Sequence, residues 1–143
     1  MQNLLELGED EALIAVAAIR EELVRRNKVA VIAVSDARGE LITLLRMDGA
    51  PYPSIAVATS KVWTAARERA ATGELGRTFK ANGWQMLNSD IRYTGWDGGV
   101  PVTHRGRVVG AVAVSGLDQA EDAELARIGV ARIAERLDGA HAA

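Results

Sequence analysis

The sequence predicts a single α+β domain, in which an antiparallel sheet built from two hairpins is flanked by helices. Two β-rich runs, 29–34 and 40–47, enclose a short turn, and a second pair encloses a turn near 104–106. Amphipathic patterns precede the first pair and follow the second. Because the strands come in pairs instead of alternating singly with helices, the sheet is expected to be antiparallel.

Length and composition are those of an ordinary globular domain. The chain has 143 residues, of which 48% are hydrophobic and 25% charged. Aromatic residues make up only 4%, so the core is expected to consist of Ala, Val, Leu and Ile. A net charge of -2 gives no electrostatic reason to expect a nucleic acid or an anionic membrane as partner.

The sequence argues against cysteine-based sites, metal sites, secretion and a membrane-spanning helix. The chain contains no cysteine, which excludes disulfides, thiolate zinc sites and cysteine nucleophiles. No spacing of carboxylates or histidines marks a metal site. The N-terminus lacks the pattern of a signal peptide, and no apolar run approaches the length of a membrane-spanning helix. We therefore expect a cytoplasmic protein.

The first half of the chain predicts a helix, a hairpin and a second helix. Acidic residues begin the segment 8–27 and Arg25 and Arg26 lie near its end, as the helix dipole favours. The strands 29–34 and 40–47 flank turn residues, among which Gly39 can adopt positive φ. A loop follows, and Ser54 is expected to cap a helix that continues to about Ala71.

The second half predicts a short helix, an irregular segment, the second hairpin and a long helix. Thr72 is expected to cap the short helix, which ends near Asn82-Gly83. The segment 84–97 has no clear period. Asp118 and Glu121 form a plausible capping box for the last helix, 119–137, and the tail after it is expected to fray.

An ordered set of short motifs resembles the GlcG/HbpS family, whose domain is often called the haem-degrading domain and which includes the PduO C-terminal domain. The matching pieces extend over nearly the whole chain. They are Val31 to Asp36 with Gly39, Arg46-Met47-Asp48-Gly49-Ala50, Ser54 to Lys61, Gly98-Gly99-Val100-Pro101, Gly110 to Gly116, and Glu121-Asp122. The resemblance implies a profilin-like sheet, assembly as a homo-oligomer, and either haem binding or a role beside enzymes that degrade small organic acids.

Two charged residues follow a predicted strand, where functional side chains are common. The Arg46 guanidinium could bind a carboxylate in a bidentate fork, with Asp48 orienting it or acting as an acid or base. The alternative is an Arg46–Asp48 ion pair that only fixes the loop. Lys61, on the next helix, could be a base or an anion anchor if partly buried, or an ordinary solvated lysine. Arg46, Asp48 and Lys61 are the candidate catalytic residues.

The candidate ligand-binding residues lie in the second half. Gly98 and Gly99 could let backbone amides approach an anion, although a bulge or tight bend is the commoner role of such a pair. Trp84 and Trp96 could form an apolar wall, or part of a subunit interface. His104 could be a haem ligand or proton carrier, or simply an exposed turn residue. Neither histidine matches a haem-ligand position of the family. Haem therefore stays a candidate ligand for which no axial ligand is assigned.

These residues support two hypotheses of different class. The first is an oligomeric small-molecule-binding protein of the GlcG/HbpS type, whose ligand is flat, carries a carboxylate and could be haem. The second is a cofactor-independent isomerase, hydratase or deaminase that acts on a small unsaturated or hydroxylated organic acid. A third interpretation is a mainly structural assembly module.

Overall fold

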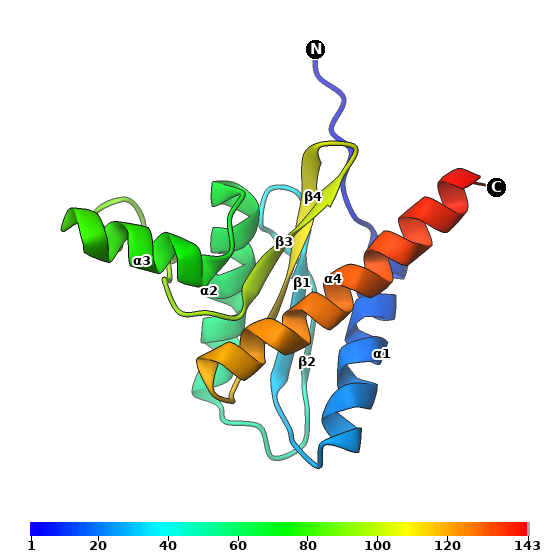
Figure 1. The fold of residues 1–143 in the computed structure, drawn as a ribbon, viewed down its shortest axis with the longest axis horizontal. Coiled ribbons are helices and arrows are strands. Elements are labelled where there is room, and N and C mark those ends of the chain that lie inside the picture. The colour runs from blue at the N-terminus through cyan, green and yellow to red at the C-terminus, as the bar shows by residue number, and fades with distance from the viewer. Residues whose placement is uncertain (143) are drawn as a thin grey trace.

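In the computed structural model, which describes residues 1–142 and the side chains of residues 1–139, a four-stranded sheet lies between helices (Figure 1). The predicted order of helix, hairpin, helices, hairpin and helix is confirmed. The elements are α1 (Glu9–Arg25), β1 (Val31–Ser35), β2 (Leu41–Arg46), α2 (Pro53–Glu68), α3 (Thr72–Asn82), the short 3-10 helix η1 (Met86–Asn88), β3 (Gly99–His104), β4 (Arg107–Ser115) and α4 (Gln119–Ala142).

The sheet is antiparallel throughout, with strand order β2-β1-β4-β3, so the two hairpins join through β1 and β4. In the first hairpin, the Asp36 carboxylate accepts hydrogen bonds from the backbone N–H groups of Arg38 and Glu40, at 2.8 and 3.0 Å. In the second, Arg105 and Gly106 both have positive φ, as a tight two-residue turn requires. The predicted α+β class is therefore confirmed.

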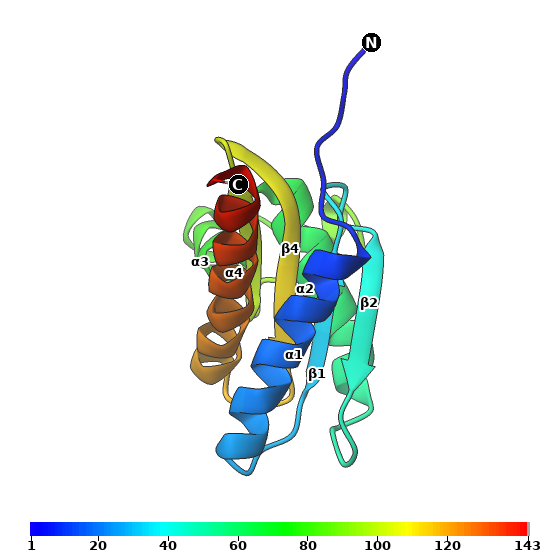
Figure 2. The ribbon, with the colours of Figure 1, turned by 90° about the vertical axis from the view of Figure 1, so that its right-hand side faces the viewer.

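Each face of the sheet carries its own apolar cluster, because successive strand residues point to opposite faces. Helices α1 and α4 cover one face and α2 covers the other, so that in Figure 2 α1 and α4 lie in front of the sheet and α2 lies behind it. Val112 lies on the α1/α4 side and Val31 on the α2 side, and both are fully buried. Both lie on the central strands, as the density of β-branched residues around them predicts.

Several helix ends differ from the predictions, and α2 ends at Glu68 and not near Ala71. Ser54 does not cap α2, because the helix begins one residue earlier at Pro53, a residue suited to a first helical turn. Thr72 is the first residue of α3, and its hydroxyl instead bridges two backbone groups outside the helix. Helix α4 continues to Ala142, beyond the predicted end at Leu137. No helix in the described residues combines the length and apolarity needed to cross a membrane.

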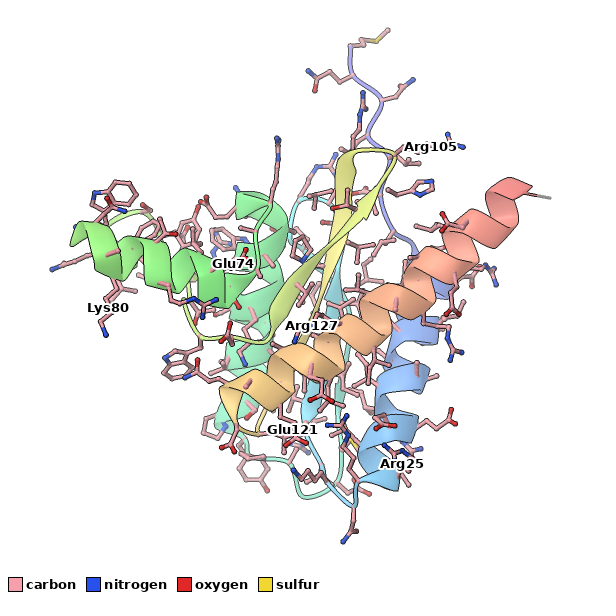
Figure 3. The ribbon with its side chains drawn as sticks, in the orientation of Figure 1. Arg25, Glu74, Lys80, Arg105, Glu121 and Arg127 are labelled. Carbon is pink, nitrogen blue, oxygen red and sulfur yellow. The ribbon has the colours of Figure 1, made fainter. Side chains whose placement is uncertain are left out.

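One end of the sheet gathers most of the motifs on which the family resemblance rests. Val31, the first residue of β1, pairs with Arg46 at the end of β2 and with Ser115 at the end of β4. The carbonyl of Gly98 accepts a hydrogen bond from the N–H of Val114, which adds the start of β3 to this end. The C-terminus of α1 and the N-terminus of α4 also meet here, where Arg25 and Glu121 are labelled in Figure 3.

Candidate functional site

Arg46 closes β2 with an exposed guanidinium at the rim of two hollows. One hollow, of about 290 Å³, includes Arg20 and Met47 in its lining, and the other, of about 360 Å³, includes Tyr52. The guanidinium carbon lies 5.2 Å from the centroid of the Tyr52 ring, and 74% of Tyr52 is exposed. A cation over an aromatic face is attracted by the ring quadrupole and keeps its N–H donors for other partners.

Asp48 also lines both hollows, but it does not neutralise Arg46. Within the described part of the chain, no salt bridge joins Arg46 to Asp48 or to any other carboxylate. The loop is shaped by its backbone instead: Gly49 has a φ of 85°, and the N–H of Ala50 donates to the carbonyl of Met47. The Arg46 guanidinium is therefore available to an external anion.

Lys61 occupies a different environment, a buried ion pair. Its ammonium lies 3.1 Å from Oδ2 of Asp122 and donates to the carbonyl oxygen of Val114 at 2.9 Å. The two residues are 1% and 2% exposed. Burial lowers the pKa of the Lys61 ammonium and raises the pKa of the Asp122 carboxyl, while the attraction between the two opposes both shifts.

The Gly98-Gly99 segment is shaped around this ion pair. Gly98 has a φ of 127°, and a Cβ there would lie 2.6 Å from the Lys61 Nζ and 2.6 Å from the Val114 carbonyl oxygen. A Cβ at Gly99 would lie 2.6 Å from the Lys61 carbonyl oxygen. The N–H of Gly99 donates to the Thr72 hydroxyl at 3.0 Å. The two glycines thus leave room for Lys61 and for the start of α3.

The tryptophans do not form one shared pocket. Trp63 is 4% exposed and packs edge-on against Tyr93, with the guanidinium groups of Arg67 and Arg92 over its ring at 4.6 and 4.1 Å. Trp84 lies at the end of α3, and 57% of it is exposed. Trp96 is 56% exposed, and its carbonyl accepts a hydrogen bond from Thr72.

His104 lies at the opposite end of the sheet from Arg46 and Gly98, because β3 begins at Gly99 and ends at His104. It lines a cavity of about 200 Å³ together with Leu7, Val109 and Leu137. This cavity is smaller than either hollow beside Arg46. In the described part of the chain, no group of three or more His, Asp or Glu side chains could hold a metal ion.

The candidate residues therefore divide into separate places. Arg46 and Asp48 share the hollows beside β2, Lys61 lies with Gly98 and Gly99 near the other edge of the sheet, and none of the hollows contains both sets. Trp84 and Trp96 lie on the segment around η1, and His104 lies at the far end. The sequence did not identify two partners as site residues: Asp122, which appears there only in the family motif Glu121-Asp122, and Tyr52, which lies in the loop before α2.

Comparison with known proteins gives a consistent family assignment. The family model described as "Haem degrading protein HbpS-like" matches residues 7–131. Protein GlcG of Escherichia coli K12 is 34% identical over 115 residues, covering 80% of this chain and 85% of the relative. An uncharacterised 15.0 kDa protein from the dhaT–dhaS intergenic region of Citrobacter freundii is 32% identical over 113 residues, covering 76% of this chain and 79% of the relative.

Solved structures with the same fold support the same family assignment. ORFY of Klebsiella pneumoniae superposes with a TM-score of 0.85 at 27% identity, covering 94% of each chain. HbpS gives a TM-score of 0.83 at 29% identity, covering 92% of each chain. A haem complex of PduOC gives 0.80 at 25% identity, covering 90% of this chain and 95% of that one. The predicted resemblance is confirmed, and the chain belongs to the HbpS-like family.

Proposed function

We propose that this protein binds a flat organic ligand that carries a carboxylate, and that the carboxylate binds to Arg46. The observation that carries the proposal is the availability of the Arg46 guanidinium, whose neighbour is the Tyr52 ring at 5.2 Å and not a carboxylate. A guanidinium presents planar N–H donors that match the two oxygens of a carboxylate. Such a charge-assisted pair contributes about 1.5–3 kcal/mol.

The surroundings of Arg46 suit the rest of such a ligand. Tyr52 and Pro51 give an apolar surface on one side, and Arg20 adds a second positive charge on the other. Asp48 is close enough to line the same hollows and would orient Arg46 or bind a ligand hydroxyl. A flat skeleton against Tyr52 with carboxylates toward Arg46 and Arg20 fits this distribution of charge and apolar surface.

Haem is the named candidate for this ligand, because the family model and the PduOC haem complex both point to it. Haem iron needs an axial ligand such as His, Cys, Met or Tyr, and haem propionates need cations. Beside Arg46, Tyr52 would supply an exposed phenol for the iron, and Arg46 and Arg20 would bind the propionates. His104 has no part in this arrangement, because it lies at the other end of the sheet.

Titration with haem tests the proposal. We expect a shift of the Soret band that saturates near one haem per chain, and a loss of affinity of about 10- to 100-fold in Arg46→Gln, corresponding to one charge-assisted hydrogen bond. Tyr52→Phe should keep binding but change the absorption bands that report the axial ligand. Arg132→Gln is the matched control, because Arg132 is an exposed arginine of α4 whose nearest carboxylate is Glu135.

A negative result separates haem from the broader proposal. If haem gives no Soret shift, the same variants are titrated with the dicarboxylates fumarate and malate by calorimetry. Dicarboxylate binding that is lost in Arg46→Gln would support the proposal of a carboxylate ligand and would exclude haem as that ligand. If neither haem nor a dicarboxylate distinguishes Arg46→Gln from Arg132→Gln, the proposal is wrong.

A specific observation favours an enzyme as the second candidate. The pKa values of Lys61 and Asp122 are shifted toward each other by burial, which is typical of acid–base pairs as well as of structural ion pairs. In the enzymatic alternative, Lys61 would transfer a proton to or from a small organic acid, which requires its side chain, 1% exposed here, to become accessible. Lys61→Arg tests it when turnover and thermal unfolding are measured together, because a catalytic lysine predicts a loss of turnover and a purely structural ion pair predicts a loss of stability alone.

A further inference from the structure

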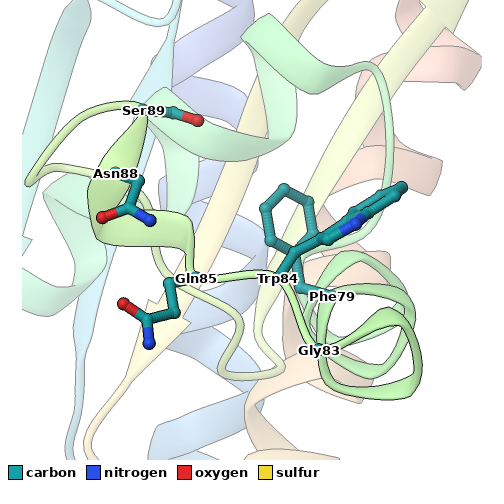
Figure 4. Close-up of a pocket in the computed structure, with 6 residues that line it drawn as sticks. All are labelled: Phe79, Gly83, Trp84, Gln85, Asn88 and Ser89. Carbon is teal, nitrogen blue, oxygen red and sulfur yellow. The ribbon is translucent and has the colours of Figure 1, made fainter.

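The hollow at the end of α3 is lined by two aromatic rings, two carboxamides and a hydroxyl, with no charged side chain (Figure 4). It is an open, shallow hollow of about 620 Å³. Its lining consists of Phe79, Gly83, Trp84, Gln85, Asn88 and Ser89. We propose that this hollow is a second binding site, separate from Arg46, for an uncharged planar heteroaromatic ring.

The backbone at the end of α3 places the two rings together. Helix α3 ends at Asn82, and Gly83 has a φ of 68°, which turns the chain back so that the N–H of Trp84 donates to the Phe79 carbonyl at 2.9 Å. The ring centroids of Phe79 and Trp84 are then 5.4 Å apart, with an angle of 83° between the ring planes. In this edge-to-face geometry the indole remains 57% exposed, and its face can stack on a ligand.

The polar groups come from the short helix η1, which follows directly. Gln85 precedes η1 and Asn88 ends it, and the N–H of Asn88 donates to the Gln85 carbonyl at 3.2 Å. Figure 4 shows the two carboxamides on the same side of the hollow, across from the rings. Each carboxamide offers both donors and an acceptor, which suits the mixed donor and acceptor edge of a heterocycle.

The hollow has a fixed support, although α3 projects away from the sheet (Figure 1). Gly76 of α3 packs directly on Gly95, so closely that neither position has room for a side chain. Thr72 attaches the start of α3 to the backbone of Trp96 and of Gly99. These contacts hold the first half of α3 against the segment that follows η1, so both parts of the chain that line the hollow are attached to the same support.

The absence of charge in the lining selects the class of ligand. A carboxylate or phosphate would gain no opposite charge from these six residues, whereas the Arg46 hollows offer it. A purely aliphatic ligand would leave the carboxamides without partners, at a cost in affinity. An uncharged ring system with polar edge atoms uses both the indole face and the carboxamides. The proposal does not rest on haem or carboxylate binding, since the two sites share no residue.

Calorimetry with three uncharged probes of increasing size, nicotinamide, adenine and riboflavin, tests the inference. We expect at least one to bind with a dissociation constant below 1 mM and benzoate to bind more weakly. Trp84→Ala should weaken the binding of that probe about tenfold, the worth of one stacked ring. Gln85→Leu and Asn88→Leu should each weaken it several-fold. Asn82→Leu is the matched control, because the Asn82 carboxamide lies at the end of α3 outside the lining of the hollow and donates to the Thr78 carbonyl.

Two results would overturn the inference. One is the absence of binding by all three probes, or binding that is equal in Trp84→Ala and Asn82→Leu. The other is a self-association in sedimentation experiments that Trp84→Ala abolishes, since a second copy of the chain would then occupy the hollow. Trp84 is exposed, so circular dichroism is expected to show an intact fold in every variant and to leave the comparison valid.

Discussion

Lys61 and Asp122 form an ion pair of 3.1 Å although their helices lie on opposite faces of the sheet. The contact is possible because it is made at the end of the sheet, beside the Val114 carbonyl and next to Gly98, which has no side chain. Asp122 also accepts a hydrogen bond from the N–H of Leu117 at 3.1 Å. This pair fixes α2 and the start of α4 to the same strand end.

Removing one member of the pair should cost more stability than removing both. Lys61→Met leaves a buried carboxylate without its partner, at a cost of about 3–5 kcal/mol in the free energy of unfolding. The double variant Lys61→Met/Asp122→Leu should recover most of that loss, because both buried charges are gone. Guanidinium denaturation of the two single variants and the double variant measures the coupling. Additive losses would contradict a direct interaction between Lys61 and Asp122.

Glycine should be required at position 98 for steric reasons and not only for its backbone conformation. Gly98 and Gly116 have nearly the same φ, 127° and 126°, but a Cβ would come no closer than 3.4 Å to other atoms at Gly116 and would lie 2.6 Å from the Lys61 Nζ at Gly98. Gly116→Ala should therefore cost about 1–3 kcal/mol from the backbone alone. Gly98→Ala should cost clearly more. Thermal unfolding compares the two, and equal losses would show that contact with Lys61 is unimportant.

Acid should weaken the contact between α1 and α4. Hydrogen bonds from Arg25 and Arg26 lower the pKa of Glu22 from 4.5 to about 2, and Lys28 and Arg26 lower the pKa of Glu121. A carboxyl whose folded pKa is depressed stabilises the fold above its unfolded pKa, and this contribution is lost as pH falls through the folded value. The expected loss thus begins near pH 4.5 and continues toward pH 2.

Arg26→Gln tests that interpretation. The variant should have a lower free energy of unfolding at pH 7 than the wild type, because Arg26 forms ion pairs with Glu22, Glu121 and Glu124. Its free energy of unfolding should also decrease less steeply between pH 5 and pH 2.5. Denaturation midpoints across this range provide the measurement, with Arg132→Gln as the control. An unchanged pH dependence in Arg26→Gln would assign the acid sensitivity to other carboxylates.

We expect the chain to form a homo-oligomer at micromolar concentration. Ile91 and Trp96 are 85% and 56% exposed in the segment that follows the hollow at η1, and such apolar surface is typical of an interface. Sedimentation equilibrium should give a mass above that of the 15.2 kDa chain. Ile91→Lys should lower it, whereas Leu13→Lys, at an exposed position of α1, should not. A single 15 kDa species would refute the expectation.

The sequence by itself was enough for the hairpins, the order of elements and the central strands. These features depend on local patterns, such as β-branched density around Val31 and Val112 and turn residues at Gly39 and Gly106, which act over a few residues. The motifs for the family resemblance were also local. Helix starts were less predictable, because Ser54 and Thr72 have the chemistry of caps but are the second residue of α2 and the first residue of α3.

Only the tertiary structure determined which charged residues form ion pairs. Lys61 and Asp122 are 61 residues apart, and their contact depends on how two helices approach one strand end, which no local pattern encodes. Arg46 and Asp48 are near neighbours and form no ion pair, because the loop directs Arg46 toward Tyr52. His104 was separated from the glycines by the length of β3. Long-range packing, and not residue type, thus determined that Lys61 is buried and paired while Arg46 remains available.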